Sequence, residues 1–307
     1  MDASVIIPSY NRGKILKRCL ELLFNQDFPK NKYEIIVVND GSTDDTEKMI
    51  KEQNPPCNFL YLKNPQREGP SKSRNLALSK AKGKVVIFID SDILTPPWFI
   101  KEHVELHKEN PGLIVDGPAI NITGEKNLIN PPFESPLVKI LAFFDFGGAT
   151  FITANTSCLL KNLIKLKGFD EEFGKGYGWQ DRELGTRLIK MGLKRVKNRK
   201  AYALHYKKEE ETGESLQNLW QKYRERGENA ILYYKKHPSA KTKKQIHLNY
   251  LKYSNFLRKI GWDEEKITYQ SISQKRKITF SLLKKAYLIH AYAEGLKEGM
   301  EKHKIRI

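Results

Sequence analysis

Cysteine is scarce in this sequence. Its three cysteines, Cys19, Cys57 and Cys158, are odd in number and lie far apart in 307 residues. This pattern argues against a disulfide framework, against a structural zinc site and against a small secreted domain. We therefore expect three buried free thiols.

Long apolar runs and targeting signals are also missing. No stretch approaches the roughly 18 consecutive apolar residues of a membrane-spanning helix. The chain begins Met1-Asp2 and enters an apolar strand pattern at once, without the features of a secretory signal. These absences predict a cytoplasmic protein, either free or held peripherally at the inner face of the membrane.

Acidic residues are few relative to basic ones, with 36 Asp and Glu against 54 Lys and Arg and a net charge of +18. Residues 207–307 hold 23 basic and 12 acidic residues, so +11 lies in this tail. Such an excess attracts anionic lipid or nucleic acid, although a solvated basic surface explains it equally well. Apolar tail residues at helical spacing favour either contact with an anionic membrane or packing within the protein. These residues are Tyr250, Tyr253, Phe256, Leu257 and Ile260.

The stretch around which the rest of the chain is organised is 84–96. Its apolar run 85–89 is rich in β-branched residues, which predicts a central parallel strand buried on both faces. Asp90 and Asp92 follow, separated by the small Ser91. Two neighbouring carboxylates repel each other unless a cation neutralises them, and hard divalent ions commonly bridge carboxylates to substrate phosphates. The alternative is a turn in which both acids cap the next segment.

Strand and helix patterns alternate before this stretch. Ser42 with Asp45 resembles a capping box before the second helix. The alternation predicts an α/β fold with a parallel, Rossmann-like sheet. The predicted strands are 3–8, 33–38 and 58–62, and the predicted helices are 13–24, a second ending near 52, and 70–82.

The pattern changes after Asp92. From Ser215 onward it is helical, with breaks near Pro238 and Gly261, which predicts one domain at 1–214 and a helical extension at 215–307. Before that point we predict helices at 98–109, 161–166 and 180–191, strands at 113–116, 150–160 and 202–205, and a long irregular functional loop at 118–148.

Six short motifs in collinear order resemble family 2 glycosyltransferases, which have the GT-A fold. Each motif is weak alone, but six at ordinary spacing are specific. The resemblance extends over about residues 2–206 and leaves the tail uncovered. The motifs lie at 5–11, 37–44, 69–75, 90–92, 168–170 and 178–181.

The resemblance implies a nucleotide site at the carboxyl ends of the first strands. The first loop, with the Tyr10 ring, would pack against the base, and Asp40 would accept a hydrogen bond from it. For Asp40 the alternative is an Asx turn. Arg74 would donate to the diphosphate, or else be a solvated helix residue. The predicted donor-binding residues are Pro8, Tyr10, Asn11, Asp40, Gly69, Arg74, Asp90 and Ser91.

The resemblance also implies a Mn²⁺ or Mg²⁺ ion. Asp92 is the expected direct ligand, with Asp90 closer to the ribose and to metal-bound waters. His205 ends the last predicted strand, where relatives often place a further metal ligand. A packed core histidine is the alternative reading of His205.

Asp181 is the residue to which the resemblance assigns the chemistry. The family usually has an acidic pair here, and this chain has Gln180-Asp181, so only the second acid is kept. Asp181 would be the general base that deprotonates the acceptor, and the alternative is a helix N-cap. Tyr177, Trp179 and Gln180 are expected on the acceptor side.

The implied activity is inverting transfer of one hexosyl group from a nucleotide-diphosphate sugar, with UDP favoured, to a hydroxyl of a glycan or lipid-linked acceptor. The expected setting is glycan, surface polysaccharide or glycolipid synthesis. Processive relatives carry Q-x-x-R-W; here Gln221 and Arg224 match but Glu225 replaces Trp, which favours single addition.

Two other functions compete with glycosyl transfer. A sugar-nucleotide pyrophosphorylase would need a Gly-rich loop after the first strand, which is missing. A non-catalytic basic protein that binds membrane or nucleic acid would have no use for intact Asp92 and Asp181. We expect no nucleic-acid partner, and the sequence leaves the sugar, the acceptor and the oligomeric state open.

Overall fold

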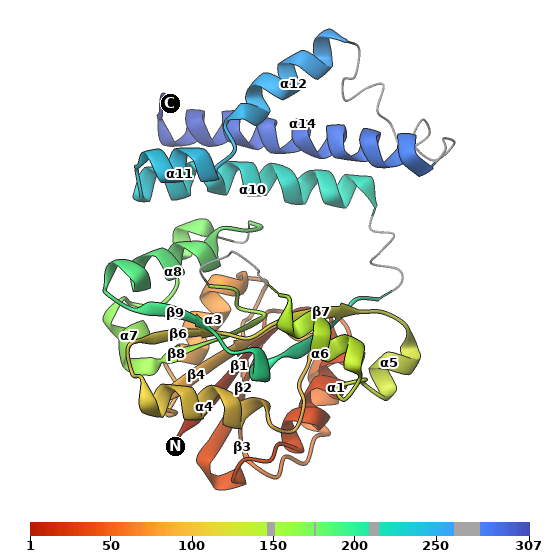
Figure 1. Cartoon of the computed structure of the whole chain (residues 1–307), viewed down its shortest axis with the longest axis vertical. Coiled ribbons are helices and arrows are strands. Elements are labelled where there is room, and N and C mark those ends of the chain that lie inside the picture. The colour runs from red at the N-terminus through yellow and green to blue at the C-terminus, as the bar shows by residue number, and fades with distance from the viewer. Residues whose placement is uncertain (146–150, 175, 209–214, 261–276) are drawn as a thin grey trace. The chain divides into compact units, whose positions relative to one another are not determined.

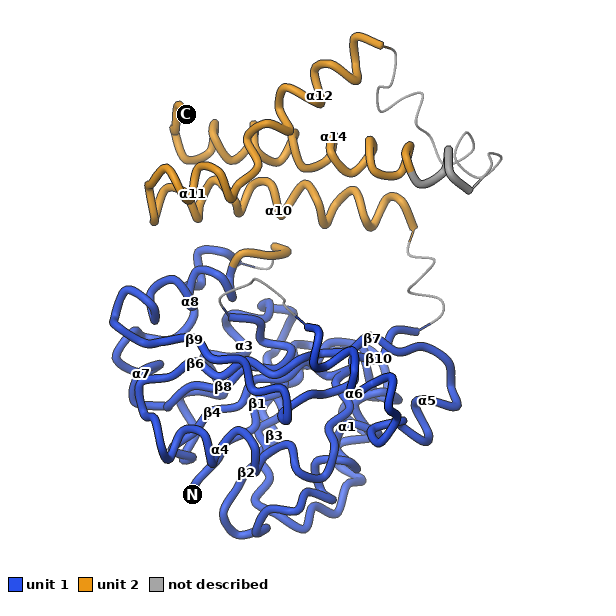
Figure 2. The backbone as a smooth tube through the Cα atoms, viewed as in Figure 1, with its two compact units in different colours: residues 1–175, 180–212 blue, residues 176–179, 213–307 orange. Residues whose placement is uncertain are grey.

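The computed structural model describes residues 1–145, 151–174, 176–208, 215–260 and 277–307, without the side chains of 277–281. The chain divides into two compact units, 1–175 with 180–212, and 176–179 with 213–307 (Figure 2). The predicted helix break near Gly261 and the predicted domain junction at 214 lie outside the described residues. The strand predicted at 150–160 starts later than expected, at Asn155.

The first unit is built on one large sheet. Its described strands lie in the order β3-β2-β1-β4-β8-β6-β9 (Figure 1). The sequence predictions for the first four strands and for β6 are confirmed to within one residue. The strands are β1 Ala3–Ser9, β2 Tyr33–Asn39, β3 Asn58–Lys63, β4 Val85–Ile89, β6 Leu113–Asp116, β8 Asn155–Leu159 and β9 Lys194–Lys197.

The sheet is mostly parallel, as the sequence predicted, but one strand beside β4 runs in the opposite direction. β4 lies in the middle of the order and is parallel to β1, but its other neighbour, β8, is antiparallel to it. Asn155, the first residue of β8, pairs with Ile89, the last residue of β4. The chain between β6 and β8 therefore returns to the sheet at its carboxyl edge, and β8 has to run back from there.

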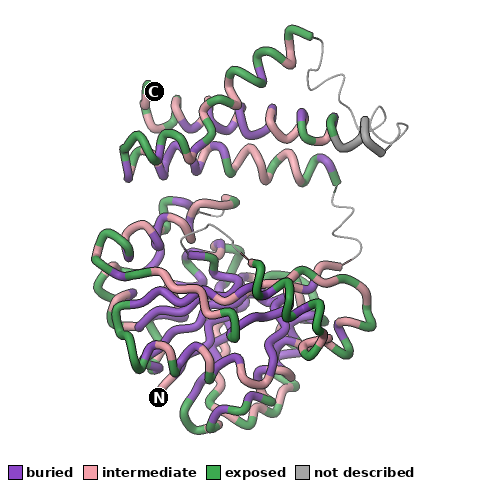
Figure 3. The backbone as a smooth tube through the Cα atoms, in the orientation of Figure 1, coloured by how far each residue is buried: buried purple, intermediate pink, exposed green. Residues whose placement is uncertain are grey.

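Helices cover both faces of this sheet, which explains why β1, β2 and β4 are buried throughout or nearly so (Figure 3). Alternate residues of β1 point to opposite faces, with Val5 and Ile7 in one core and Ile6 in the other. One core contains residues of α1 Gly13–Phe24, α2 Thr46–Lys51 and α4 Phe99–Glu109. The other contains residues of α3 Pro70–Leu78, α7 Leu160–Lys165 and α8 Gln180–Lys190.

The second helix starts later than the sequence predicted. Ser42 and Asp45 form no capping box, because α2 begins at Thr46 and the Thr46 N–H donates to Asp44 Oδ1 at 3.1 Å. Ser42 Oγ instead accepts the N–H of Asn11 at 2.9 Å. This bond ties the loop after β1 to the loop after β2, both at the carboxyl edge.

A smaller sheet replaces part of the predicted loop. Its described strands have the order β5-β10-β7. The prediction of an irregular loop at 118–148 is wrong for its described part, because one strand and two short helices lie there, and prolines hid these short elements. The strands of the small sheet are β5 Ile93–Leu94, β7 Ala119–Ile122 and β10 Ala203–Tyr206, and the two short helices are α5 Glu125–Ile129 and α6 Pro136–Phe143.

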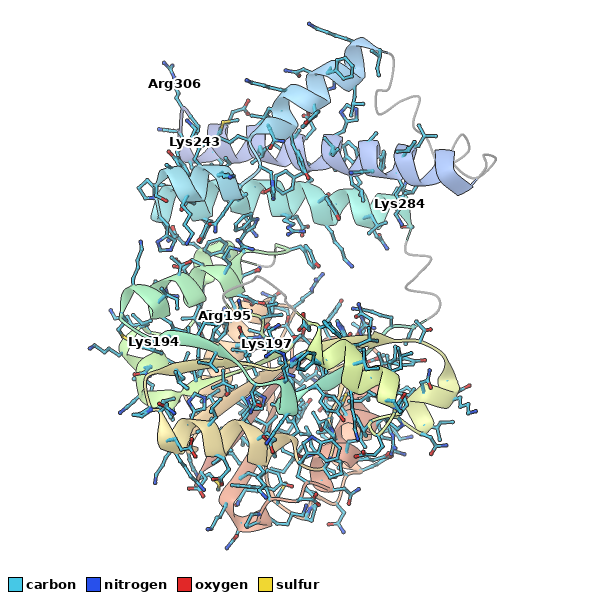
Figure 4. The ribbon with its side chains drawn as sticks, viewed as in Figure 1. Lys194, Arg195, Lys197, Lys243, Lys284 and Arg306 are labelled. Carbon is cyan, nitrogen blue, oxygen red and sulfur yellow. The ribbon has the colours of Figure 1, made fainter. Side chains whose placement is uncertain are left out.

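The edge strand β9 escaped the sequence analysis because it is basic rather than apolar. Lys194, Arg195 and Lys197 project from it (Figure 4). Arg195 pairs with Asp116, and Lys197 Nζ lies 2.8 Å from Asp145 Oδ2. Charged side chains on an edge strand discourage pairing with a further strand.

The second unit contains long helices whose backbones approach closely. A Cβ on Gly295 of α14 would lie 1.8 Å from Arg224 O, and one on Gly227 of α10 would lie 2.2 Å from Tyr292 O. Only glycine permits this approach. The predicted break near Pro238 is confirmed. The helices are α10 Leu216–Lys236, α11 Ala240–Gln245, α12 Asn249–Lys259 and α14 Lys277–His303.

The apolar face expected in the tail is divided between two environments. Tyr250 contacts the Tyr292 ring and Leu257 packs in the core of the second unit. Tyr253, Phe256 and Ile260 are each more than half exposed. Packing within the unit therefore accounts for part of this face and leaves three large apolar side chains on its surface.

Two further expectations concern cysteines and membranes. Cys19 and Cys158 are buried free thiols as predicted, but Cys57 is only partly buried, so the prediction is wrong there. Among the described helices, none combines the length and apolar character that crossing a bilayer requires.

Candidate active site

A cavity of about 240 Å³ opens at the carboxyl ends of β1 and β4. The chain passes from β1 to β2 and β3 on one side and then to β4 on the other, so β1 and β4 flank the switch point where open α/β sheets bind ligands. Most of the predicted donor-site residues line it. The lining residues are Pro8, Ser9, Tyr10, Arg12, Asp40, Arg67, Pro70, Arg74, Asp90, Ser91 and Asp92.

Strand pairing brings Asp92 and His205 together. Ile93 of β5 is in register with His205 of β10, and the Tyr206 N–H donates to Asp92 O at 2.9 Å. His205 Nε2 consequently lies 3.2 Å from Asp92 Oδ1. More than a hundred residues separate this acid and this histidine in sequence, and the small sheet places them at one wall of the site.

The pair has the properties of a cation site. Lys207 Nζ lies 2.8 Å from His205 Nε2 on the same side of the ring as Asp92 Oδ1. Asp92 Oδ1 is buried and has no hydrogen-bond partner. Burial alone would raise the pKa of Asp92, but the His205 ring, Arg12 and Lys207 lower it on balance, so the carboxylate is charged.

These donors fit a hard divalent ion. Within the described part of the chain no cluster of three or more His, Cys, Asp or Glu side chains could hold a metal alone. Mg²⁺ in particular is often bound through one or two carboxylates, with waters and substrate phosphates completing its coordination. Asp92 and His205 would supply the protein ligands.

Arg74 connects three parts of the site. Its Nη2 donates to Asp90 Oδ1 at 2.9 Å, and its Nη1 lies 3.7 Å from Asp181 Oδ1. The side chain is buried, stacks over the Phe169 ring, and leaves Nε without a partner. The sequence alternative of a solvated helix arginine is therefore wrong.

The electrostatics separate the two strand-end acids. Burial raises the pKa of Asp90, the Arg74 guanidinium opposes this, and the carboxylates of Asp92 and Asp181 raise the pKa further. Asp92 has the opposite net shift. The pKa of Asp90 is therefore raised on balance, whereas that of Asp92 is lowered.

Asp181 lies in the first turn of α8 and faces the same group of charges. Its Oδ2 accepts from Thr153 Oγ1 at 3.0 Å and from the Thr153 N–H at 3.3 Å. Its side chain is about one third exposed. Thr153 holds one carboxylate oxygen and leaves the other near Arg74.

Asp40 accepts more hydrogen bonds from the rest of the protein than the sequence suggested. Its carboxylate is buried and accepts four hydrogen bonds that hold the loop between β3 and α3. The donors are Asn64 Nδ2 at 2.7 Å, the Glu68 N–H at 2.9 Å, the Gly69 N–H at 2.9 Å and Ser73 Oγ at 3.0 Å. Gly69 has φ +92° and turns the chain into α3 at this point.

The first loop contributes both predicted and unpredicted residues. Tyr10 is partly exposed and lies under the Arg67 guanidinium, 4.8 Å from ring centre to Cζ. Asn11 lies beside the cavity rather than in its lining, and its Oδ1 accepts the Thr43 N–H. Arg12 and Arg67 were missed by the sequence analysis, although both are basic residues directly beside recognised motifs.

The predicted acceptor-side residues divide between the two units. Tyr177 and Trp179 belong to the second unit, where the Trp179 ring stacks on Tyr233 of α10 at 5.0 Å and its Nε1–H donates to Arg226 O. Tyr177 is half exposed, and its N–H donates to Glu225 Oε2. Gln180 is buried at the start of α8 in the first unit.

The partial Q-x-x-R-W match has structural partners in α10. Gln221 Nε2 donates to Glu225 Oε1, and Arg224 pairs with Glu298 of α14. Glu225, which stands where processive relatives have Trp, accepts bonds from both Gln221 and the Tyr177 backbone.

A mostly parallel sheet flanked by helices, with paired acids at its switch point, has the GT-A glycosyltransferase fold. Residues 4–165 match glycosyl transferase family 2, and the chain belongs to that family.

Two sequence relatives illustrate the match. The chain is 29% identical over 243 residues to the uncharacterised glycosyltransferase YfnE of Bacillus subtilis, covering 63% of this chain and 62% of YfnE. It is 45% identical over 96 residues to the poly(ribitol-phosphate) beta-N-acetylglucosaminyltransferase TarS of Staphylococcus aureus, covering 30% of this chain and 16% of TarS. The chain thus spans less than two thirds of either relative.

Solved structures share the fold. TarS residues 1–349 in complex with UDP-GlcNAc superpose with a TM-score of 0.60 at 20% identity, covering 98% of this chain and 92% of that one. The mannosyltransferase PcManGT from Pyrobaculum calidifontis, in complex with GDP-Man and Mn²⁺, gives 0.61 at 18% identity, covering 96% and 87%.

Proposed function

We propose that this chain is a metal-dependent, inverting glycosyltransferase that moves one hexosyl group from a nucleotide-diphosphate sugar, preferably a UDP-sugar, to an acceptor hydroxyl. The observation that carries the proposal is the convergence of Asp92 with His205, and of Asp90 and Asp181 with Arg74, at the switch-point cavity. Asp92 and Asp90 come from the end of β4, and Asp181 comes from a distant helix.

The cavity walls suit each part of the donor. Tyr10 offers a ring face for the base beside Pro8, while Arg12, Arg67 and Arg74 offer positive charge for the diphosphate. Asp40 holds the loop that carries Arg67 and uses its remaining acceptor capacity toward the base. Asp90 lies between Arg74 and the metal ligands, where a ribose hydroxyl can donate to it.

The metal at Asp92 and His205, Mn²⁺ or Mg²⁺, would neutralise charge that grows on the departing diphosphate. Asp181 takes the proton from the acceptor hydroxyl as the oxygen attacks the anomeric carbon. A bond forms between that oxygen and the anomeric carbon, and the bond from this carbon to the donor phosphate breaks, with its electron pair leaving on the diphosphate. Attack opposite the leaving group inverts the configuration.

The named relatives support the coarse class of donor and acceptor. TarS is named for transfer of N-acetylglucosamine to poly(ribitol-phosphate), and its structure holds UDP-GlcNAc. PcManGT holds GDP-Man with Mn²⁺. The name and ligand of TarS support a glycan acceptor, surface polysaccharide synthesis and a UDP-sugar, whereas PcManGT holds a GDP-sugar. A lipid-linked acceptor in glycolipid synthesis belongs to the same proposal. The Glu225 replacement supports single addition.

The division at about residue 214 into a catalytic domain and a helical extension is part of the same proposal. The extension's net charge of +13, from 21 basic and 8 acidic residues, and the exposed Tyr253, Phe256 and Ile260 support peripheral contact with an anionic membrane at its cytoplasmic face. Loss of binding to anionic vesicles in a variant that replaces all three with Ser would support this contact, and unchanged binding would refute it.

A thermal-shift and hydrolysis screen tests the central proposal. UDP, GDP and dTDP are offered with and without Mn²⁺ or Mg²⁺, followed by hydrolysis of the corresponding nucleotide sugars. We expect stabilisation by a nucleoside diphosphate only with the divalent ion, and slow hydrolysis of at least one sugar donor. Stabilisation by nucleic acid alone, without any nucleotide response, would contradict the proposal.

A further inference from the structure

A second cavity lies in the first unit, at the edge of the sheet opposite the candidate active site. It measures about 600 Å³, within the usual range for small-molecule sites. Lys84 and Val85 open β4 at this edge, whereas Asp90 follows β4 at the other. The active-site proposal uses none of its lining residues, which are Asp2, Lys82, Gly83, Lys84, Val85, Val104, His107, Lys108, Leu159, Leu160, Lys161 and Ile164.

The cavity combines a buried apolar floor with an exposed basic rim. Val85, Val104 and Leu159 are buried, while Ile164 is 61% exposed at the outer side. The rim carries four lysines against one carboxylate, a net charge of +3 at neutral pH; they are Lys82, Lys84, Lys108, Lys161 and Asp2.

Most of this positive charge is not compensated by the protein. Lys108 pairs with Glu105 at 2.7 Å, and no ion pair to Lys82, Lys84 or Lys161 is found among the described residues. Lysines clustered around an apolar floor repel one another, and an anion between them removes this repulsion.

The backbone around the cavity is held firmly. The Val85 N–H donates to Asp2 O at 2.9 Å, and the Leu160 N–H donates to Lys84 O at 2.9 Å. These bonds fasten the first strand, β4 and the end of β8 to one another. The cavity therefore needs no rearrangement to form.

His107 adds an unsatisfied polar atom to the wall. Asn155 Oδ1 can only accept, so His103 Nε2 carries the proton in their 2.9 Å bond, and Ser157 Oγ donates to His103 Nδ1 at 2.8 Å. Ser157 Oγ then accepts from His107 Nε2 at 2.9 Å. His107 Nδ1 is left as a buried acceptor without a partner.

We propose that this cavity binds an amphiphilic anion, a phosphate or carboxylate head attached to an apolar body of about ten carbons. The lysines hold the head as point charges, and Val85, Val104, Leu159 and Ile164 cover the apolar body. Nucleic acid does not fit this site, because its charges would face an apolar floor.

Calorimetry with decyl phosphate, below its micelle-forming concentration, tests the proposal on the full chain. We expect one site for decyl phosphate and none for decanol or inorganic phosphate at the same concentration. The variant Lys108→Gln/Lys161→Gln should bind about tenfold more weakly, since two partly exposed ion pairs are lost. The matched control Lys101→Gln/Lys165→Gln removes two exposed lysines from the same two helices, outside the cavity, and should bind within about twofold of the original chain.

Two further measurements exclude other locations. Saturating UDP with Mn²⁺ should leave decyl phosphate binding unchanged, and competition would overturn the proposal by moving the anion to the active site. Phe144→Ser changes an exposed apolar residue that follows α6 and should also have no effect. Binding that is lost in Phe144→Ser, or equally in both lysine pairs, would refute the cavity site.

Vesicles distinguish the two sources of such a ligand. Both arms use the chain in which Tyr253, Phe256 and Ile260 are replaced by Ser, so that the tail does not bind vesicles. If vesicles containing a phosphate lipid bind this chain but not its Lys108/Lys161 variant, the ligand comes from a bilayer. If only dissolved decyl phosphate shows this dependence, the ligand is taken from solution. Both outcomes support the site, and lack of any difference between the lysine variants in both arms would refute it.

Discussion

The two ends of β4 face opposite chemical environments. At the carboxyl end, Asp92 Oδ1 and Arg74 Nε are buried without partners. A chain of bonds runs from Asn155, opposite the carboxyl end of β4, through His103 and Ser157 to His107, which lines the cavity at the amino end, and it leaves one lone pair unsatisfied. Arg74 is paired with Asp90 and Asp92 lies beside His205, but a charged group that keeps one buried atom without a hydrogen bond costs more than a neutral acceptor in the same state. The difference indicates that the carboxyl end is arranged to receive a ligand, whereas buried histidines at the amino end mainly stabilise the fold.

The largest effect should come from the base at the carboxyl end. Asp181→Asn keeps the side-chain size and the bonds from Thr153 but cannot accept a proton, so turnover should fall by about 10² to 10⁴. Donor affinity, measured by calorimetry, should survive. Near-normal turnover would reduce Asp181 to a helix cap, and lost donor binding would move it to the metal site.

Replacing Asp92 should greatly weaken metal-supported binding of the nucleotide and leave the fold intact. In Asp92→Ala we expect the affinity for a nucleoside diphosphate in the presence of Mn²⁺ to fall by at least about 100-fold, while affinity without metal is unchanged. The fold should stay intact, because an acid that follows a strand end contributes little to the core. Unchanged Mn²⁺-supported affinity would show that the metal is held elsewhere.

The buried histidines His103 and His107 should make the stability of the protein depend on pH. Burial lowers the pKa of His103 to about 3 and that of His107 to about 4, below the 6.5 of an exposed histidine. As the pH is lowered from 6.5 to 4, the histidines of the unfolded chain bind protons, whereas the buried histidines of the folded chain stay neutral. The free energy of unfolding therefore decreases as the pH is lowered. For His107 the loss between pH 7.5 and pH 5 is about 2 kcal/mol.

Urea unfolding at both pH values measures this dependence. His107→Leu removes one of the two groups, so its stability should fall less between pH 7.5 and 5 than that of the original chain. The comparison uses the change with pH in each protein, which is independent of any packing defect in the variant. Equal changes in the two proteins would show that His107 is not a buried neutral group.

The smallest effect separates two acids of the carboxyl end. Both carboxylate oxygens of Asp40 already accept hydrogen bonds from the protein, so Asp40→Asn places an amide N–H against one of these donors and should lower the free energy of unfolding by about 1.5 kcal/mol. Asp92 Oδ1 accepts no hydrogen bond, so Asp92→Asn should lower the free energy of unfolding less than Asp40→Asn does. A larger loss of stability in Asp92→Asn than in Asp40→Asn would reverse this assignment of a structural and a binding acid.

The sequence predicted most of the sheet because its signals are local. Residues 85–89 form an apolar run long enough for a buried strand, and the helical spacing in 13–24 predicted α1 with its observed ends. β9 escaped because it is basic, and β5 and β7 escaped because they are too short to show a periodic pattern; pairing with other strands stabilises all three.

The residue types of the site could likewise be read from motifs, but their partners could not. Asp92, Asp181 and Arg74 were recognisable in sequence, whereas the 3.2 Å approach of His205 to Asp92 depends on the antiparallel pairing of β5 with β10. The bond from Thr153 to Asp181 depends equally on how the chain returns before β8. A side chain's chemistry is local, but its distance to a residue a hundred positions away is determined only when strands pair and helices pack.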